Sequence, residues 1–222
     1  MKFDLLSNID KAHFIRKAST LVEALPYIRK HAGKIIVIKY GGHAMVNKEI
    51  NKSFSRDICL LKEIGINPII VHGGGPQIAE MLKEKNIKTE FVGGLRVTNK
   101  ETVKIVEEVL SKDINQKVVQ AINKSGGKAI GLSGSINKLI EAKKLNFKYQ
   151  ESDSNIEKIL DLGFVGEPVN INTQIINKVI RDGLIPVIAP LGVGSDNEIY
   201  NINADTAAGA IAGSIKASKL LL

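Results

Sequence analysis

Short runs of Ile and Val that lead directly into small-residue loops restrict the fold of this chain more than any other feature. Two segments share the pattern: residues 34–40 before Gly41-Gly42 and residues 68–72 before Gly73-Gly74-Gly75. Residues 128–132 predict a third strand, which also leads into a small-residue loop, Ser133-Gly134-Ser135. Continuous β-branched residues predict strands that are buried on both faces, which is typical of a parallel sheet. Glycine at the end of each strand allows the backbone to turn sharply or to approach a ligand closely.

Helical patterns alternate with these strands along the chain, which predicts an α/β fold with a mainly parallel sheet. We expect helices over residues 47–64, 76–85, 99–123, 173–182 and 205–218, and further strands over 164–166, 184–189 and 219–222. Residues 138–150 predict an exposed strand pair, 150–155 a polar loop, and 192–200 a hairpin. Thr98 and Glu101 fit a capping box, so Thr98 is the expected N-cap of the long helix.

An amphipathic helix is expected over residues 13–30, before the first strand. Its apolar positions recur every three or four residues: Ile15, Ala18, Val22, Leu25 and Ile28. Pro26 should kink or divide this helix. The helix could pack on its own domain, or it could be an arm that exchanges with a neighbouring subunit.

Charge and composition narrow the class of partner. The chain has 31 basic and 23 acidic residues, a net charge of +8, which favours anionic ligands. The basic residues are scattered and Trp is absent, so a solvated lysine-rich surface is a better interpretation than nucleic-acid binding. No apolar run approaches the roughly 20 residues of a membrane-spanning helix. With a single cysteine and no secretory signal, we expect a soluble, cytoplasmic protein that binds no membrane.

Lys39 is the first candidate site residue, because it lies at the end of a buried strand immediately before Gly41-Gly42. Ligands of open α/β sheets bind beyond the carboxyl ends of the strands, where glycine loops and helix N-termini favour anions. A lysine there could neutralise a phosphoryl group in transfer. The alternatives are a lysine that reaches solvent and loops that are simply tight turns. The sequence contains neither a P-loop nor a Rossmann glycine pattern.

Arg96 and the segment from Asn201 to Asp205 supply the other candidates. Arg96 precedes a helix and could clamp a carboxylate, or it could be a surface arginine. Alternation places Asn201 and Asn203 on one face of a strand. Asp205 could be an N-cap, could hold a lysine in place, or could lie near a metal. The four histidines show no metal-ligand spacing, so no zinc site is predicted, and His72 is interpreted as structural.

Four motifs together resemble the acetylglutamate kinases of the amino acid kinase superfamily. They are Val37-Ile38-Lys39-Tyr40-Gly41-Gly42-His43-Ala44-Met45, Val71-His72-Gly73-Gly74-Gly75-Pro76, Gly93-Gly94-Leu95-Arg96-Val97-Thr98, and Tyr200-Asn201-Ile202-Asn203-Ala204-Asp205. The resemblance extends from about Leu21 to the last residue. One departure is Ser135-Ile136-Asn137, where a Lys-Asp-Gly run is usual in the family.

The resemblance implies an αβα sandwich with an open sheet, and phosphorylation of the side-chain carboxylate of N-acetyl-L-glutamate by ATP with Mg²⁺, a step of arginine biosynthesis. The implied roles are these: Lys39 stabilises the transferring phosphoryl group, Gly41 and Gly42 cradle it, Gly74 and Gly75 bind the substrate, Arg96 and Asn201 hold its α-carboxylate, and Asp205 orients the catalytic lysine. Such chemistry needs positioning and charge neutralisation, without a covalent nucleophile.

The resemblance also implies a domain organisation. Residues 1–33 correspond to an N-terminal arm, 34–218 to the amino-acid-substrate lobe, and 219–222 to the start of a nucleotide-binding lobe that continues in family members and carries a second lysine. Arms of this type assemble dimers into hexamers, so a homo-oligomer is expected. The alternatives are a non-catalytic module that binds N-acetylglutamate or mediates assembly, and a kinase of a related small substrate.

Overall fold

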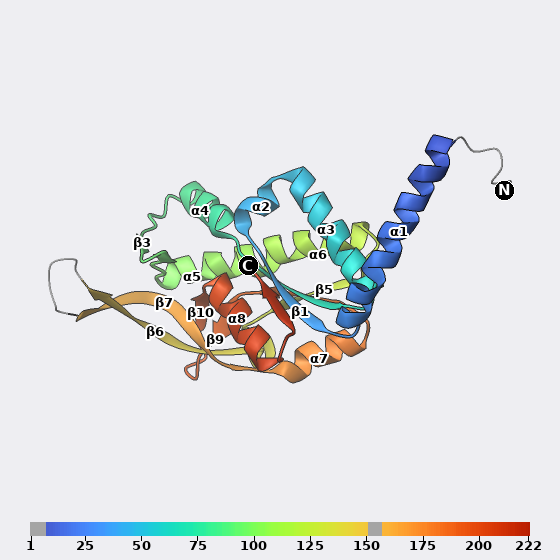
Figure 1. Cartoon of the computed structure of the whole chain (residues 1–222). Helices are drawn as coiled ribbons and strands as arrows, with labels where there is room; N and C mark the ends of the chain where they lie inside the picture. Colours follow the sequence, from blue (N-terminus) through green and yellow to red (C-terminus); the bar gives the residue numbers. More distant parts are fainter. Residues whose placement is uncertain (1–7, 151–156) are drawn as a thin grey trace.

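A five-stranded parallel sheet forms the centre of the molecule, for which a computed structural model describes residues 8–150 and 157–222 (Figure 1). In spatial order its strands are β11 (Lys219–Leu221), β1 (Ile35–Tyr40), β2 (Asn67–His72), β8 (Ile185–Ala189) and β5 (Ala129–Ser133). β1 pairs with β2 from Ile35–Asn67 to Tyr40–His72. The parallel sheet expected from the Ile and Val runs is therefore confirmed.

Helices cover both faces of this sheet, which confirms the αβα sandwich. Along β1, Ile36 and Ile38 enter one apolar core and Val37 enters the other, because successive side chains point to opposite faces. The helices on the first face are α3 (Lys48–Glu63), α4 (Gly75–Glu84), α5 (Lys100–Glu107) and α6 (Asn115–Lys124). Those on the second face are α7 (Thr173–Arg181) and α8 (Ala204–Ser214). The short helix α2 (Gly42–Val46) follows β1 directly.

The long helix expected over residues 99–123 is present but irregular. A π-helical segment, η2 (Glu108–Ile114), separates α5 from α6. Thr98 is not the N-cap: Asn99 is, and its side-chain oxygen accepts hydrogen bonds from the N–H groups of Glu101 and Thr102. The capping-box prediction was wrong by one residue, because the backbone of Thr98 pairs with residues 162 and 164 instead.

A closed barrel, which the sequence did not indicate, lies against the second face of the sheet. It consists of β6 (Ile140–Gln150), β7 (Glu157–Ile171), β9 (Leu191–Val193) and β10 (Ile199–Ile202). The strand pair expected within 138–150 is wrong, since β6 is one strand whose partner is β7. β7 is also much longer than the strand expected at 164–166. The predicted strand was too short because Gly163, Gly166 and Pro168 resemble strand breakers. The expected polar loop falls largely on residues 151–156, outside the described residues.

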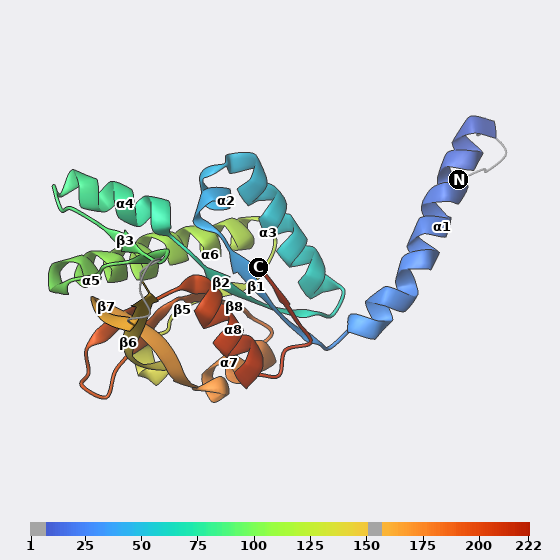
Figure 2. The same ribbon diagram turned by 60° about the vertical axis from the view of Figure 1, so that its left-hand side comes forward.

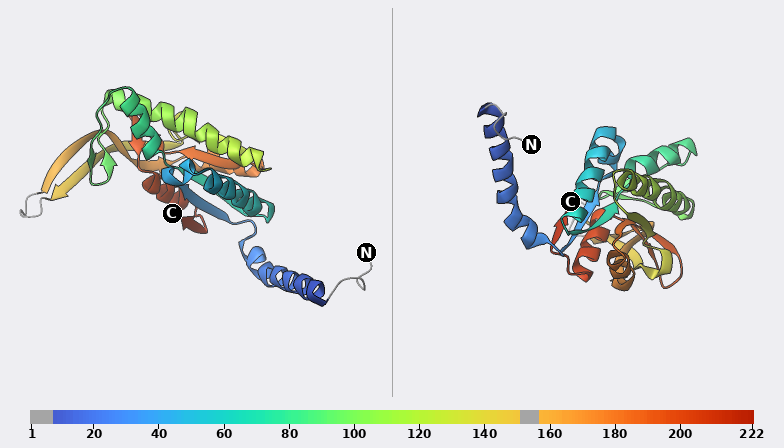
Figure 3. Two further views of the ribbon diagram at one scale, coloured as in Figure 1. Left: turned by 90° about the horizontal axis from the view of Figure 1, so that it is seen from above. Right: turned by 90° about the vertical axis from the view of Figure 1, so that its right-hand side faces the viewer.

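The N-terminal helix α1 (Asn8–His31) projects away from the sheet and its helices (Figures 1, 2 and 3). Of the two outcomes expected at Pro26, a kink or a division, the division is excluded, because the helix continues through this residue. Proline removes one hydrogen bond, to the carbonyl four residues earlier, and Val22 is exposed enough for water to replace it. Ile15 and Val22 are 63% and 64% exposed, so the apolar stripe is not packed on its own domain. None of the described helices combines the length and apolarity needed to cross a membrane.

Candidate functional site

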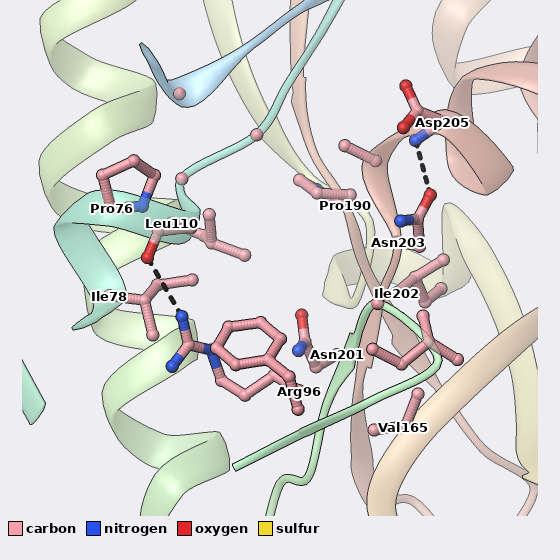
Figure 4. Close-up of a pocket in the computed structure, with 18 of the residues that line it drawn as sticks. Pro76, Ile78, Arg96, Leu110, Val165, Pro190, Asn201, Ile202, Asn203 and Asp205 are labelled. Carbon is pink, nitrogen blue, oxygen red and sulfur yellow. Dashed lines mark hydrogen bonds between the residues drawn. The ribbon is translucent and has the colours of Figure 1, made fainter. Parts of the chain in front are cut away.

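A cavity of about 230 Å³ lies where the carboxyl ends of β1 and β2 face the barrel (Figure 4). Seven of the eight site residues expected from the sequence line it: Lys39, Gly42, Gly74, Gly75, Arg96, Asn201 and Asp205. Gly41, the eighth, lies beside it, since a Cβ built there would be 4.0 Å from the Lys39 Nζ. Site residues from four segments far apart in sequence therefore converge on one site.

Lys39 and Asp205 form an ion pair across the end of the sheet. The distance between Lys39 Nζ and Asp205 Oδ1 is 2.9 Å, and both side chains remain partly exposed. Asp205 is not the N-cap of α8, because the Asn203 side chain accepts the hydrogen bonds from the N–H groups of residues 205 and 206. Of the three roles considered for Asp205, the geometry matches the one in which it holds a lysine.

The two glycine loops touch each other at the base of the cavity. A Cβ on Gly42 would lie 2.8 Å from the Pro76 Cδ, so only glycine permits this approach. Gly74 packs in the same way against Leu110 and Ile114 of the π-helical segment. At Gly75 a Cβ would meet nothing within 4 Å, because this residue faces open space. The close packing fixes the loop backbone and leaves its last residue accessible to a ligand.

Arg96, on β4 (Leu95–Arg96), carries a positive charge that is only 5% exposed. Its guanidinium donates hydrogen bonds to the Thr89 Oγ1 at 2.6 Å and to the Gly75 carbonyl at 3.0 Å, and it lies 4.5 Å from the centre of the Phe91 ring. Burial lowers the pKa of Arg96. Within the described part of the chain, Arg96 forms no ion pair with a carboxylate. A buried cation with only neutral partners favours an anionic ligand.

Asn201 lies near Arg96 at the same end of the cavity (Figure 4). It lies on β10, where it pairs in register with Val165 of β7 and Leu191 of β9. Its Nδ2 is 3.5 Å from the Thr98 Oγ1. An amide beside a guanidinium can donate a further hydrogen bond to a carboxylate that the guanidinium binds. The structure thus brings together the two residues that the sequence separated by more than a hundred positions.

His72 lies beneath the site and is fully buried, as expected for a structural residue. Its Nδ1 is 3.0 Å from the Gly73 carbonyl oxygen, and its Nε2 is 3.1 Å from the Asn115 Nδ2. Because Nδ1 donates to the carbonyl, Nε2 accepts from the amide, which is the hydrogen-bonding pattern of a neutral ring. Burial lowers the pKa of His72 to about 4.

Sequence reasoning missed the neighbours that position the site residues. Thr89 and Phe91 hold Arg96, and Asn115 holds His72. Thr89 and Phe91 are two positions apart, a spacing that places two side chains on one face of a strand. This spacing could have indicated the small hairpin of β3 (Phe91–Val92) and β4, in which Phe91 pairs with Arg96. Nothing in the sequence around Asn115 marks its contact with a residue 43 positions away.

The fold and the site define a class of protein: an open parallel α/β sheet whose carboxyl edge holds a buried cation, a paired lysine and glycine loops suited to small anions. The sequence profile described as the Amino acid kinase family matches residues 34–222. The chain therefore belongs to the amino acid kinase family.

Curated relatives identify a narrower group within that family. The acetylglutamate kinase of Rhodospirillum centenum is 54% identical over 212 residues, which cover 96% of this chain and 70% of the relative. The acetylglutamate kinase of Geobacter metallireducens is 52% identical over 210 residues, which cover 95% and 72%. The resemblance found in the motifs is confirmed at the level of the whole chain.

Solved structures share the same fold. The protein smu.665 of Streptococcus mutans is 30% identical, with a TM-score of 0.72 over 85% of this chain and 71% of that chain. The N-acetylglutamate synthase of Neisseria gonorrhoeae, solved with coenzyme A and N-acetyl-glutamate, has a TM-score of 0.75 over 91% of this chain and 44% of that chain. At 21% identity, this second likeness shows the fold alone.

Proposed function

We propose that the protein is an acetylglutamate kinase whose cavity binds N-acetyl-L-glutamate for phosphorylation of the side-chain carboxylate by ATP. The observation that carries this proposal is the buried Arg96 guanidinium with only neutral partners, beside Asn201 and in the same cavity as Lys39. Two separate anion-binding positions in one cavity suit a substrate with two carboxylates. The high identity to acetylglutamate kinases over most of the chain supports the same function.

The geometry suggests how each carboxylate is used. Arg96 and Asn201 hold the α-carboxylate, while the Gly74 and Gly75 backbone positions the substrate. The side-chain carboxylate then points toward Lys39, where its oxygen attacks the γ-phosphorus of ATP, the bond to the bridging oxygen breaks, and ADP leaves. Lys39 neutralises charge on the transferring group above Gly41 and Gly42, and Asp205 orients the lysine at 2.9 Å.

Mg²⁺ accompanies ATP in this proposal. Among residues 8–150 and 157–222, no group of three or more His, Cys, Asp or Glu side chains is placed to hold a metal ion. Mg²⁺ in phosphoryl-transfer sites is commonly bound through substrate phosphates with one or two carboxylates, so the residues present are compatible with an ion that arrives with the nucleotide.

The location, the oligomeric state and the division of the chain into lobes are also part of this proposal. We place the reaction in the cytoplasm and expect a homo-oligomer, a dimer or a hexamer, in which α1 contacts a second copy of the chain. The division into an arm at 1–33, a substrate lobe at 34–218 and a further lobe from 219 stays a prediction. The exposed stripe of α1 supports the role of the arm.

Calorimetric titration with N-acetyl-L-glutamate tests the binding function. Arg96→Ala should raise the dissociation constant about 100-fold, because it removes one partner of a desolvated charge pair. Arg181→Ala changes an exposed arginine at the end of α7 and is the matched control. Unchanged affinity in Arg96→Ala would rule out this cavity as the carboxylate site.

An assay of ADP release with ATP and N-acetyl-L-glutamate tests the kinase function separately. Lys39→Ala should abolish ADP release and leave substrate binding within a few-fold of wild type. Binding of the substrate by wild type without any ADP release would favour the non-catalytic binding module. A substrate panel with no preference for N-acetylglutamate would favour a kinase of another small substrate.

A further inference from the structure

We propose that Thr98 is a positioning residue that makes the site selective for a carboxylate over a carboxamide, by fixing which end of the Asn201 amide can face the ligand. This inference rests on the proposed function, in which Arg96 and Asn201 bind the α-carboxylate. Thr98 is fully buried, and as it is not the helix cap, its hydroxyl is free for another role.

The hydrogen bonds of the Thr98 hydroxyl have a fixed direction. Its Oγ1 is 2.7 Å from the Arg96 carbonyl oxygen, a group that can only accept. The single hydroxyl proton of Thr98 is therefore committed to Arg96, and the hydroxyl oxygen can only accept from other neighbours. The neighbour at 3.5 Å is the Asn201 side chain.

The orientation of the Asn201 amide follows from the hydroxyl beside it. An amide has one end that only accepts and one that donates two hydrogen bonds, and these two ends are assigned from the hydrogen-bond network. Because Thr98 offers a lone pair, the network selects the orientation in which the Asn201 Nδ2 faces Thr98. The same nitrogen retains a second proton, and we infer that this proton is directed into the cavity, which Asn201 lines. That proton matches a carboxylate oxygen and opposes the NH₂ group of a carboxamide.

Backbone hydrogen bonds hold Thr98 in place. Its N–H donates to the Leu162 carbonyl at 2.9 Å, and its carbonyl accepts from the Phe164 N–H at 2.6 Å, so both backbone groups are bound to β7. β7 also pairs directly with Asn201 through Val165. Thr98 and Asn201 are thus both held by the same strand, β7. Gly163 permits the close approach of β7 to Thr98, because a Cβ at this position would collide with the Thr98 carbonyl.

Two hydrogen bonds of the Thr98 hydroxyl therefore connect Asn201 with Arg96, the two residues proposed to bind the α-carboxylate. Removing the hydroxyl would leave Arg96 able to attract a negative charge, but would free the Asn201 amide to rotate. Its carbonyl oxygen could then accept a hydrogen bond from a carboxamide. The measurable consequence is a loss of selectivity, which is distinct from a general loss of affinity.

The test compares the dissociation constants of N-acetyl-L-glutamate and of its α-carboxamide, measured by calorimetry on the complete chain. Wild type should prefer the carboxylate by about 100-fold or more, as expected where a mismatched ligand leaves buried polar groups unpaired. Thr98→Val should reduce the ratio of the two dissociation constants about tenfold, since the effect of one oriented hydrogen bond is of this size. Thr98→Ser, which keeps the hydroxyl, should retain the wild-type ratio.

Thr102→Val is the matched control, because it makes the same change on a residue that is 2% exposed in the same helix region. It should leave the ratio unchanged. If Thr98→Val does not fold, as judged by circular dichroism, Thr98→Ala provides the same measurement without the added methyl group. A wild-type ratio in the folded valine or alanine variant, even with weaker binding of both ligands, would overturn the inference. No preference in wild type would overturn the proposed function and this inference together.

Discussion

His72 occupies a position in which a charged imidazole would be surrounded by the apolar core. The pKa of this side chain is lowered by burial to about 4 in the folded protein, against 6.5 in an unfolded chain. The unfolded state therefore binds more protons between these two values, and stability falls as pH falls through them. From pH 7 to pH 5 the loss from this group is about 2 kcal/mol.

Replacing His72 with glutamine should remove most of this pH dependence, because an amide oxygen can accept the Asn115 N–H without titrating. The measurement is urea unfolding at pH 7 and pH 5. His13→Gln makes the same change on the exposed surface of α1 and should keep the wild-type difference in unfolding free energy between pH 7 and pH 5. If wild type and His72→Gln lose the same unfolding free energy between pH 7 and pH 5, His72 is not the cause of the pH dependence.

At the scale of single residues, the sequence was most informative where a residue type had a fixed geometric context. Lys39 before a glycine loop and Arg96 before a helix could both be selected as candidates, because strand ends and helix starts are readable from local patterns. The network through Thr98 was not readable. It depends on the contact between Asn201 and Thr98, which are more than a hundred positions apart and are brought together by the pairing of β7 with β10.

Gly163 joins two elements, the start of α5 and the strand β7, and gives a prediction at the scale of elements. Its φ is +76°, and a Cβ would collide with the Thr98 carbonyl oxygen. Gly183 has a nearly identical φ of +77° with nothing within 4 Å of a Cβ. Gly183→Ala should therefore lose only about 1 kcal/mol of stability from the left-handed backbone, while Gly163→Ala should lose about 2 kcal/mol more from the collision.

Urea unfolding of the two alanine variants measures this difference directly, because both share the backbone penalty. Gly163→Ala should also disturb carboxylate selectivity, whereas Gly183→Ala should not. Equal midpoints for the two variants would mean that β7 can move away from Thr98 without loss, which would contradict the close contact as a determinant of the fold.

The elements differ in how well the sequence predicted them. Strands buried on both faces were found at β1, β2 and β8, because a short continuous run of Ile and Val between glycine-rich turns is typical of a strand in the centre of a parallel sheet. β6 and β7 were not recognised as a long hairpin. Their pattern includes charged side chains, and Gly166 in β7 looks like a breaker although the close approach of Tyr200 requires it. The π-helical segment has no sequence signal of its own.

At the scale of the whole molecule, α1 projects from the fold (Figure 3), and its apolar residues Ile15, Val22 and Leu25 are exposed within the part of the chain that the structure describes. The stripe lies on a helix that projects from the fold, so an isolated copy would keep these side chains in water. Burial of such a stripe against the same stripe of a second copy removes apolar surface from water, which stabilises association. The arm is thus the element of the structure best suited to assembly.

Light scattering of the wild-type protein should accordingly show a hexamer, built from dimers joined through α1. Val22→Asp with Leu25→Asp should reduce the mass to that of a dimer, because each charge would have to be desolvated in the arm contact. Ile136→Asp places the same charge on another exposed apolar residue, 60% exposed and far from α1 in sequence, and should leave the hexamer intact. A wild-type mass no larger than a dimer would exclude assembly through the arm, and the exposed stripe would then require another partner.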